Sequence, residues 1–316
     1  MPEPTQPAVH PIVASKLSKR YREVLAVDGV DIDLPAGIVA GFVGPNGAGK
    51  TTTIQLLLGL AHPTGGSARV LGEPIEHPER YLRRVGALIE SPAFYPALSG
   101  QRNLEVLVRL GRLDAHRIPE VLELVGLTGR AGDRVKTYSL GMKQRLGVAA
   151  ALLPDPDLVI LDEPTNGLDP SGIREMRSVM RGLADRGITV LVSSHLLAEI
   201  EAICDHLMMI DHGRIVFQGA IAGLLDAQHA GIVARPEHDS DLEQLMKLAA
   251  SAGKPARIED GALYVTADED WAAELNRQAF AAGITLRALE VTRASLEDAF
   301  FAITEGEEQP AEEVPA

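Results

Sequence analysis

One short stretch constrains the fold of this chain more than any other part of the sequence. Residues 44–51 read Gly-Pro-Asn-Gly-Ala-Gly-Lys-Thr and match the pattern G-x-x-x-x-G-K-[ST]. The apolar run Ile38 to Val43 precedes them and is typical of a strand buried on both faces of a sheet. The apolar-rich stretch Thr52 to Leu60 follows and is expected to be a helix. A strand, a glycine-rich loop and a helix in this order predict an α/β domain.

The chemistry of this loop suits a phosphate group. Glycines allow the loop to curl so that successive backbone N–H groups point inward, and the N-terminus of the following helix adds a partial positive charge. Lys50 would bridge the β- and γ-phosphates of a nucleotide, and the Thr51 hydroxyl would hold Mg²⁺. The alternative is a glycine-rich turn that binds nothing. The residues predicted to bind the nucleotide here are Gly44, Pro45, Asn46, Gly47, Ala48, Gly49, Lys50, Thr51 and Thr52.

A second apolar run ends in two carboxylates. Leu158 to Leu161 precede Asp162 and Glu163, a pattern typical of a central parallel strand with acidic groups at its C-terminal edge, where α/β folds bind ligands. We predict that Asp162 reaches the magnesium through water and that Glu163 orients the attacking water as general base. For this pattern alone, a plain strand end is the alternative.

Upstream of that strand, residues 138–145 read Tyr-Ser-Leu-Gly-Met-Lys-Gln-Arg. This octet resembles the signature of ATP-binding cassette (ABC) ATPases, usually Leu-Ser-Gly-Gly-Gln followed by Gln-Arg. Ser139 and Gly141 match, and they would offer a hydroxyl and a bare backbone N–H to an anion at a helix start. Taken alone, Ser139 could be an ordinary helix cap. The signature differs from the usual one at Tyr138, Leu140 and Met142.

Three further matches follow from the resemblance. Residues 167–169, Gly-Leu-Asp, look like the D-loop, so Asp169 would link two nucleotide sites across an interface. His195 looks like the switch histidine that contacts the γ-phosphate, although an isolated histidine before a helix is often a cap or a surface residue. Tyr21 corresponds to the aromatic residue on which adenine stacks; its alternative is a tyrosine packed at a strand edge.

One position departs from the family pattern. Most cassettes have a glutamine in the Q-loop, and this chain has Glu90. A carboxylate can still bind magnesium, but it adds negative charge beside the phosphates. The stretch from Glu90 to Pro96 and the signature resemble ATPases of antibiotic-resistance exporters of the bacitracin or daunorubicin kind. This resemblance covers residues 12 to about 219, and Ser295 to Phe300 resemble the C-terminal part of such subunits more weakly.

The resemblance implies ATP and Mg²⁺ as cofactors and a homodimer that closes head to tail on two nucleotides. Each nucleotide would lie between the Lys50 loop of one protomer and the Ser139 signature of the other. Closing and reopening would drive a separate membrane permease that exports drugs or related compounds, with a coupling surface expected between Glu90 and Arg112. The alternatives are a soluble cassette ATPase acting on the ribosome or chromosome, and a nucleotide-gated binding module that never turns over.

Charge and composition restrict the partners and the compartment. The formal net charge is −14 at pH 7, which argues against nucleic-acid binding. No apolar run approaches the roughly 20 residues that a membrane-spanning helix needs. Cys204 is the one cysteine, and the residues before Lys16 lack the pattern of a secretory signal. We therefore expect a peripheral protein on the cytoplasmic face of the membrane, held there by its permease.

The charge is uneven along the chain and suggests a domain boundary. Residues 220–316 carry 7 basic and 19 acidic residues, whereas residues 1–219 are nearly balanced. The predicted fold is a P-loop NTPase cassette over residues 12–219, with a mostly parallel sheet core, an antiparallel β subdomain and a helical subdomain at about 91–153. An acidic α+β domain over residues 220–304 follows, between disordered tails at 1–11 and 305–316.

The second domain shows a pattern of short alternating elements. Strands are expected at 231–234, 256–258, 262–266 and 284–291, and helices at 240–252 and 269–282. This β-α-β-β-α-β order is found in ferredoxin-like folds. A final helix would begin at Ser295, capped by the pair Ser295 and Asp298, and Trp271 and Phe300 are expected in the core. The domain carries no catalytic pattern, so we expect a regulatory or dimer-stabilising role.

Overall fold

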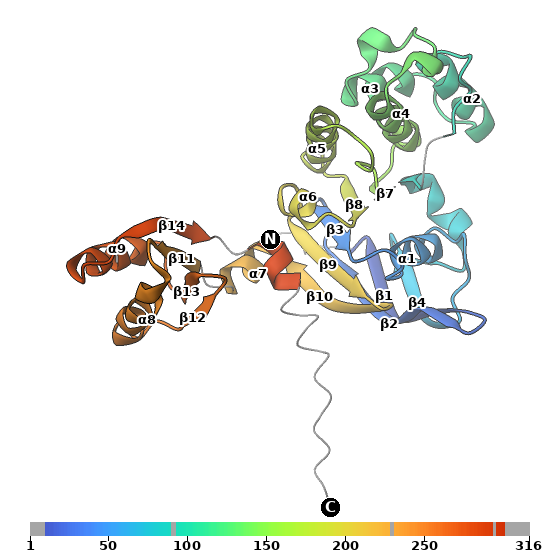
Figure 1. The fold of residues 1–316 in the computed structure, drawn as a ribbon. Coiled ribbons are helices and arrows are strands. Elements are labelled where there is room, and N and C mark those ends of the chain that lie inside the picture. The colour runs from blue at the N-terminus through green and yellow to red at the C-terminus, as the bar shows by residue number, and fades with distance from the viewer. Residues whose placement is uncertain (1–9, 90–92, 228–230, 293–294, 301–316) are drawn as a thin grey trace, which may run out of the picture. The chain divides into compact units, whose positions relative to one another are not determined.

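The chain divides into two compact units after Ile221 (Figure 1). The computed structural model describes residues 10–89, 93–227, 231–292 and 295–300. Glu90, which the sequence places at the Q-loop position, lies outside the described residues. Within the described residues, no helix is both long enough and apolar enough to cross a bilayer.

A six-stranded sheet forms the centre of the first unit, with the strand order β10-β9-β3-β8-β7-β6. All neighbours pair in parallel except β9 and β10, which form an antiparallel pair. Every residue of β3, β7 and β8 is buried, and for β3 and β7 the apolar runs in the sequence predict this burial. The strands of this sheet are β3 (Val39–Val43), β6 (Val85–Leu88), β7 (Leu158–Asp162), β8 (Thr189–Ser194), β9 (His206–Asp211) and β10 (Arg214–Ala220).

An antiparallel sheet of order β2-β1-β4-β5 completes the β structure of this unit. Its strands are β1 (Ile12–Tyr21), β2 (Val24–Leu34), β4 (Gly65–Val70) and β5 (Glu73–Pro74). Leu17 of β1, Phe42 of β3 and Ile54 of the helix after β3 belong to one buried apolar cluster. The two sheets and that helix therefore share a core, which fixes the loop between β3 and the helix.

The helices of the first unit include the one that follows the glycine-rich loop. This helix, α1, ends at Leu57, so the predicted end at Leu60 is wrong. Gly59 has φ 67°, a left-handed conformation that ends helices and that glycine adopts without strain. The helices are α1 (Lys50–Leu57), α2 (Gly100–Gly111), α3 (Arg117–Leu124), α4 (Leu140–Leu152), α5 (Pro170–Ala184), α6 (Leu197–Glu201) and α7 (Ile221–Ala227), the last of which crosses the boundary.

The helices α2, α3 and α4 contact one another and lie together in Figure 1, and α4 also packs against β6, β7 and α5. Short 3-10 turns connect the regular elements. They lie at Pro78–Arg80, Leu82–Arg84, Thr128–Arg130 and Val135–Thr137. Ser99 caps α2 and Ser139 caps α4, because each side-chain oxygen accepts a hydrogen bond from a backbone N–H of the first turn.

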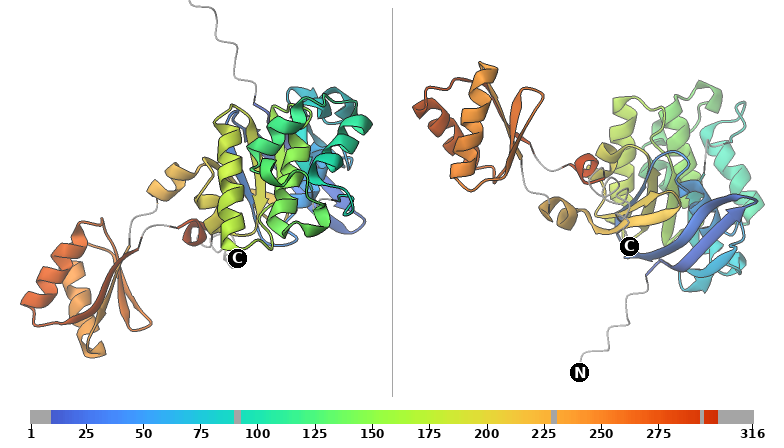
Figure 2. Two further views of the ribbon diagram at one scale, coloured as in Figure 1. Left: turned by 90° about the horizontal axis from the view of Figure 1, so that it is seen from above. Right: turned by 60° about the horizontal axis from the view of Figure 1, so that its bottom comes forward.

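The second unit has the predicted element order, β-α-β-β-α-β. Its elements are β11 (Gly231–Pro236), α8 (Leu242–Ser251), β12 (Ala256–Glu259), β13 (Ala262–Thr266), α9 (Trp271–Ala281) and β14 (Leu286–Thr292). The sheet is antiparallel with the order β12-β13-β11-β14, and both helices cover one face of it (Figure 2). Helix α8 begins two residues later than predicted, because a 3-10 turn occupies Asp239–Asp241.

The core of this unit lies between the helices and the sheet. Leu245, Leu263 and Leu275 are fully buried in it, and Trp271 is half-buried against it. Residues 296–300 are helical, and the Ser295 Oγ accepts a hydrogen bond from the Asp298 backbone N–H at 3.1 Å, the predicted cap.

Candidate functional site

The loop between β3 and α1 encloses the Lys50 ammonium group. Lys50 is only 6% exposed, and its Nζ donates to the carbonyl oxygens of Gly44 (2.6 Å) and Pro45 (3.2 Å). Burial lowers the pKa of Lys50, and the nearby carboxylates of Glu163 and Asp162 partly oppose that shift. A cation is thus held at the base of the loop with two neutral acceptors and negative charge nearby.

Glycine is required at position 49, just before Lys50. Gly49 caps α1 with φ 109°, which side-chain-bearing residues rarely adopt. A Cβ on Gly49 would also lie 2.4 Å from the Ala26 carbonyl oxygen of β2. The close approach of β2 to the loop therefore depends on this glycine.

The oxygen groups beside Lys50 come from α1 and from the end of β7. Thr51 donates from Oγ1 to Asp162 Oδ2 at 3.0 Å, and Asp162 is 6% exposed. A hydroxyl and a carboxylate are the hard oxygen donors that Mg²⁺ prefers, and Mg²⁺ commonly takes one or two carboxylates plus substrate phosphates. No group of three His, Cys, Asp or Glu side chains suited to a metal occurs among the residues that the structure describes. The pair Thr51 and Asp162 fits a magnesium ion that also needs nucleotide oxygens.

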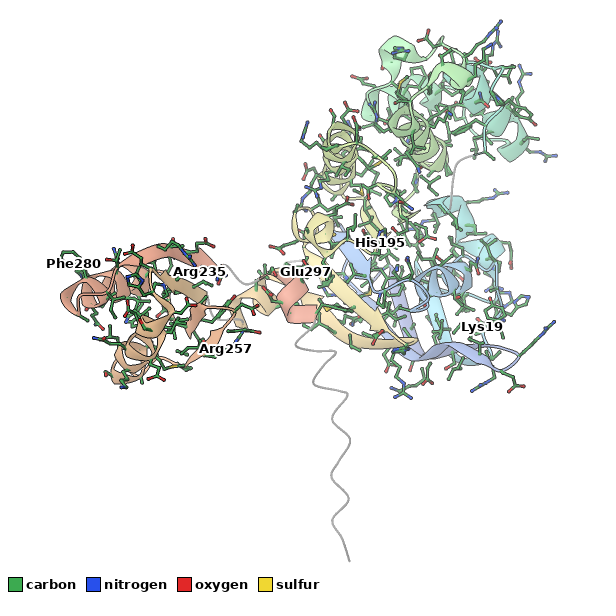
Figure 3. All side chains as sticks on the ribbon, viewed as in Figure 1. Lys19, His195, Arg235, Arg257, Phe280 and Glu297 are labelled. Atoms are coloured by element: carbon green, nitrogen blue, oxygen red, sulfur yellow. The ribbon has the colours of Figure 1, made fainter. Side chains whose placement is uncertain are left out.

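Glu163 and His195 meet at the C-terminal edge of the parallel sheet, and Figure 3 labels His195 there. Asp162 of β7 pairs in register with Ser193 of β8, so the residues that follow both strands lie close together. His195 Nδ1 is 2.8 Å from Glu163 Oε2, and Lys50 Nζ is 3.8 Å from Glu163 Oε1. The predicted general base, the predicted switch histidine and the predicted phosphate-binding lysine are therefore neighbours.

Ser193 joins the two carboxyl-bearing residues of this edge. Its hydroxyl donates to Asp162 Oδ1 and accepts from the Glu163 backbone N–H at 3.0 Å, and its side chain has no exposed surface. Glu163 has φ 50°, a left-handed conformation that is strained for a residue with a side chain. Sequence reasoning missed Ser193, because its role depends on the register between β7 and β8.

A cavity of about 290 Å³ lies over these groups. Its polar lining suits a charged ligand. Residues predicted from the sequence form most of the lining, together with two that were not predicted, Ala26 and Asn166. The lining residues are Ala26, Asn46, Gly47, Gly49, Lys50, Thr51, Thr52, Glu163, Asn166 and His195.

Three predicted residues cluster outside that lining. Ser139 caps α4, accepting from the Met142 N–H at 3.2 Å, and Asp169 caps α5, accepting from the Gly172 N–H at 2.9 Å. A Cβ on Gly141 would lie 3.8 Å from the Gly172 Cα, so the two helix starts are adjacent. The structure thus brings Ser139, Gly141 and Asp169 together, apart from the residues that line the Lys50 cavity.

Tyr21, the predicted adenine contact, ends β1 and is 45% exposed. The Lys19 ammonium lies 4.8 Å from the centre of its ring (Figure 3 labels Lys19). Tyr21 is not among the residues that line the cavity described above. Its ring remains available to a base, and its contact with adenine stays a prediction.

Comparison with known proteins agrees with this geometry. The family described as ABC transporter matches residues 27–166. The chain is 38% identical over 298 residues to the bacitracin transport ATP-binding protein BcrA of Bacillus licheniformis, covering 93% of this chain and 97% of that protein. It is 36% identical over 322 residues to the daunorubicin/doxorubicin resistance ATP-binding protein DrrA of Streptomyces peucetius, covering 95% and 94%.

A solved ATP-binding subunit of an ABC transporter has the same fold, with a TM-score of 0.60 and 29% identity. The similarity covers 68% of this chain and 92% of that one. The glycine-rich loop, the signature and the D-loop resemble those of ABC ATPases. The relatives that span nearly the whole chain are ATP-binding proteins of the same family, so the motifs and the relatives indicate one family. This chain belongs to the ABC transporter family of ATP-binding proteins.

Proposed function

We propose that this ATP-binding subunit hydrolyses ATP and that hydrolysis drives export through a separate membrane permease. The observation that carries the proposal is the position of Glu163, whose carboxylate contacts both His195 and Lys50 at the cavity. A base next to a phosphate-binding cation and a histidine is the arrangement needed to aim water at a terminal phosphate.

Each group has a distinct task in this reaction. The backbone N–H groups of the loop and the Lys50 ammonium bind the phosphates and compensate their charge. Thr51 and Asp162 would hold Mg²⁺, which when bound neutralises charge on the phosphate oxygens. Glu163 orients the attacking water and accepts its proton, and His195 holds the Glu163 carboxylate and reaches the γ-phosphate.

A second protomer would complete the site. Ser139 and Gly141 lie at the start of α4, a helix N-terminus suited to an anion, yet they are not among the described residues that line the Lys50 cavity. Their separation supports a head-to-tail homodimer, in which the α4 start of one protomer adds donors to the phosphates bound by its partner. Asp169, beside Gly141, would then lie at the interface.

The permease contact is proposed on the exposed side of α2. A groove of about 500 Å³ is lined mostly by apolar residues of β6, α2 and α4, including Leu107 and Leu110, and by Leu113, which follows α2. Leu110 is 76% exposed and adjoins the other apolar residues of the groove, and a contiguous exposed apolar patch marks an interaction surface. This groove overlaps the expected coupling region and supports a partner on the cytoplasmic face of the membrane. Because BcrA and DrrA are named for bacitracin transport and daunorubicin resistance, we propose drug-like cargo.

The test is Glu163→Gln, which keeps the side-chain shape and removes the base. Phosphate release should fall by about two to four orders of magnitude, the size of a general-base contribution, while ATP affinity is retained. Glu175→Gln is the matched control, because Glu175 of α5 pairs with Arg145 of α4 at 2.9 Å and does not line the cavity. Undiminished phosphate release by Glu163→Gln would refute the assignment of the base.

A further inference from the structure

A buried pair of side chains lies near the site but takes no part in lining its cavity. Thr165 is 7% exposed and Glu199 is 8% exposed, and Thr165 Oγ1 donates to Glu199 Oε2 at 2.5 Å. Burying a carboxyl group is costly unless it is hydrogen-bonded, and the bond to Thr165 meets that need. Such a pair is therefore expected to resist separation.

The pair joins the two segments that carry the catalytic residues. Thr165 comes two residues after Glu163, and Glu199 lies in α6, four residues after His195. Glu163 and His195 meet at 2.8 Å at the cavity. The segment after β7 and the segment after β8 are thus connected at two points, one at the cavity and one in the interior.

The second connection has a mechanical consequence for the first. Ser193 and the pairing of β7 with β8 hold the starts of the two segments, and the buried Thr165–Glu199 bond restrains the segments beyond Glu163 and His195. The strained backbone of Glu163, with φ 50°, persists only where surrounding contacts hold it. Catalytic groups must keep their positions closely, since a misplacement of about 1 Å can cost about a hundredfold in rate.

We propose that Thr165 and Glu199 are positioning residues that hold Glu163 against His195. Neither side chain touches the nucleotide cavity; both act through the loops that bear the catalytic residues. The inference rests on the proposed function, ATP hydrolysis. It predicts that loss of the Thr165 hydroxyl slows the chemical step without weakening ATP binding.

The kinetic test compares two substitutions at Thr165 with one control. Thr165→Val keeps the shape and removes the hydroxyl, and kcat for ATP should fall about 10- to 100-fold with unchanged ATP affinity. Thr165→Ser retains a hydroxyl and should restore most of kcat. Thr189→Val is the control, because Thr189 is 1% exposed at the opposite end of β8 and its Oγ1 accepts from the Gly37 N–H at 3.0 Å.

A second readout does not depend on turnover. In Thr165→Val, amide hydrogen exchange of the nucleotide-free full chain should become faster in both residues 163–169 and residues 194–199. In Thr189→Val, exchange should be unchanged in both segments. If the unaltered chain releases no phosphate, the proposed function is refuted. Hydrogen exchange still tests the Thr165–Glu199 connection in that case, because it does not depend on turnover. Equal losses of kcat in Thr165→Val and Thr189→Val, no rescue by serine, or faster exchange in only one segment would overturn the proposal.

Discussion

Ser193→Ala tests how the parallel sheet organises the nucleotide site. The substitution removes one oxygen atom from a position with no exposed surface, and the methyl group of alanine keeps the backbone geometry. Two hydrogen bonds disappear, one donated to Asp162 and one accepted from the Glu163 N–H. The first orients the predicted magnesium ligand, and the second holds the strained backbone of the predicted base.

The expected size of the effect follows from these two bonds. A hydrogen bond to a charged group contributes about 1.5–3 kcal/mol and a neutral one about 1 kcal/mol, so the free energy of unfolding should fall by about 2.5–4 kcal/mol. The part that holds Glu163 is the neutral bond. If its full contribution of about 1 kcal/mol is lost from the positioning of Glu163, turnover should fall about fivefold.

Phosphate release and chemical denaturation of the same preparations measure these two effects. Ser194→Ala is the matched control, because Ser194 is 2% exposed. Within the described residues, its hydroxyl accepts one hydrogen bond, from the Leu196 N–H, and forms none with Asp162 or Glu163. We expect Ser194→Ala to lose about 1 kcal/mol of stability and little turnover. If Ser194→Ala reduces turnover as much as Ser193→Ala does, the register argument for Ser193 is wrong.

Two further predictions concern other parts of the first unit. Lys50→Ala should weaken ATP binding itself in a nucleotide titration, since Lys50 is the cation at the base of the loop; unchanged affinity would contradict that role. Burial raises the pKa of Tyr81 to about 12, and its hydroxyl donates to the Leu57 carbonyl at 2.9 Å. Tyrosine in the unfolded chain ionises near pH 10. Between about pH 10 and 12, Tyr81 is therefore protonated in the folded state and ionised in the unfolded state. The free energy of unfolding falls by about 2–3 kcal/mol across that window. In Tyr81→Phe, denaturation curves should lack this part of the alkaline decline; an identical decline would show that Tyr81 is not its source.

Much of the site could be predicted from the sequence because short-range chemistry encodes it. The loop at residues 44–51 places its glycines, lysine and threonine within a few residues of one another, and the structure puts Gly49, Lys50 and Thr51 at one cavity. The apolar runs before this loop and before Asp162 predict buried parallel strands, which β3 and β7 are. The element order of the second unit also follows from local patterns of strand, helix and turn residues.

Helix ends were less well predicted, because they depend on single backbone conformations. The apolar pattern continues to Leu60, but Gly59 turns left-handed and α1 ends at Leu57. In the second unit, a 3-10 turn at Asp239–Asp241 delays the start of α8.

By itself, the sequence determined which chemical groups this protein has and on which kind of element each one lies, because periodicity, turns and caps act over a few residues. Only the tertiary structure decided which of those groups meet. Ser193 reaches Asp162 across 31 positions, and Thr165 reaches Glu199 across 34. Both contacts depend on β7 and β8 pairing in parallel with one particular register. A shift of that register by one residue would turn Ser193 to the other face of the sheet and would displace the segments that carry Thr165 and Glu199.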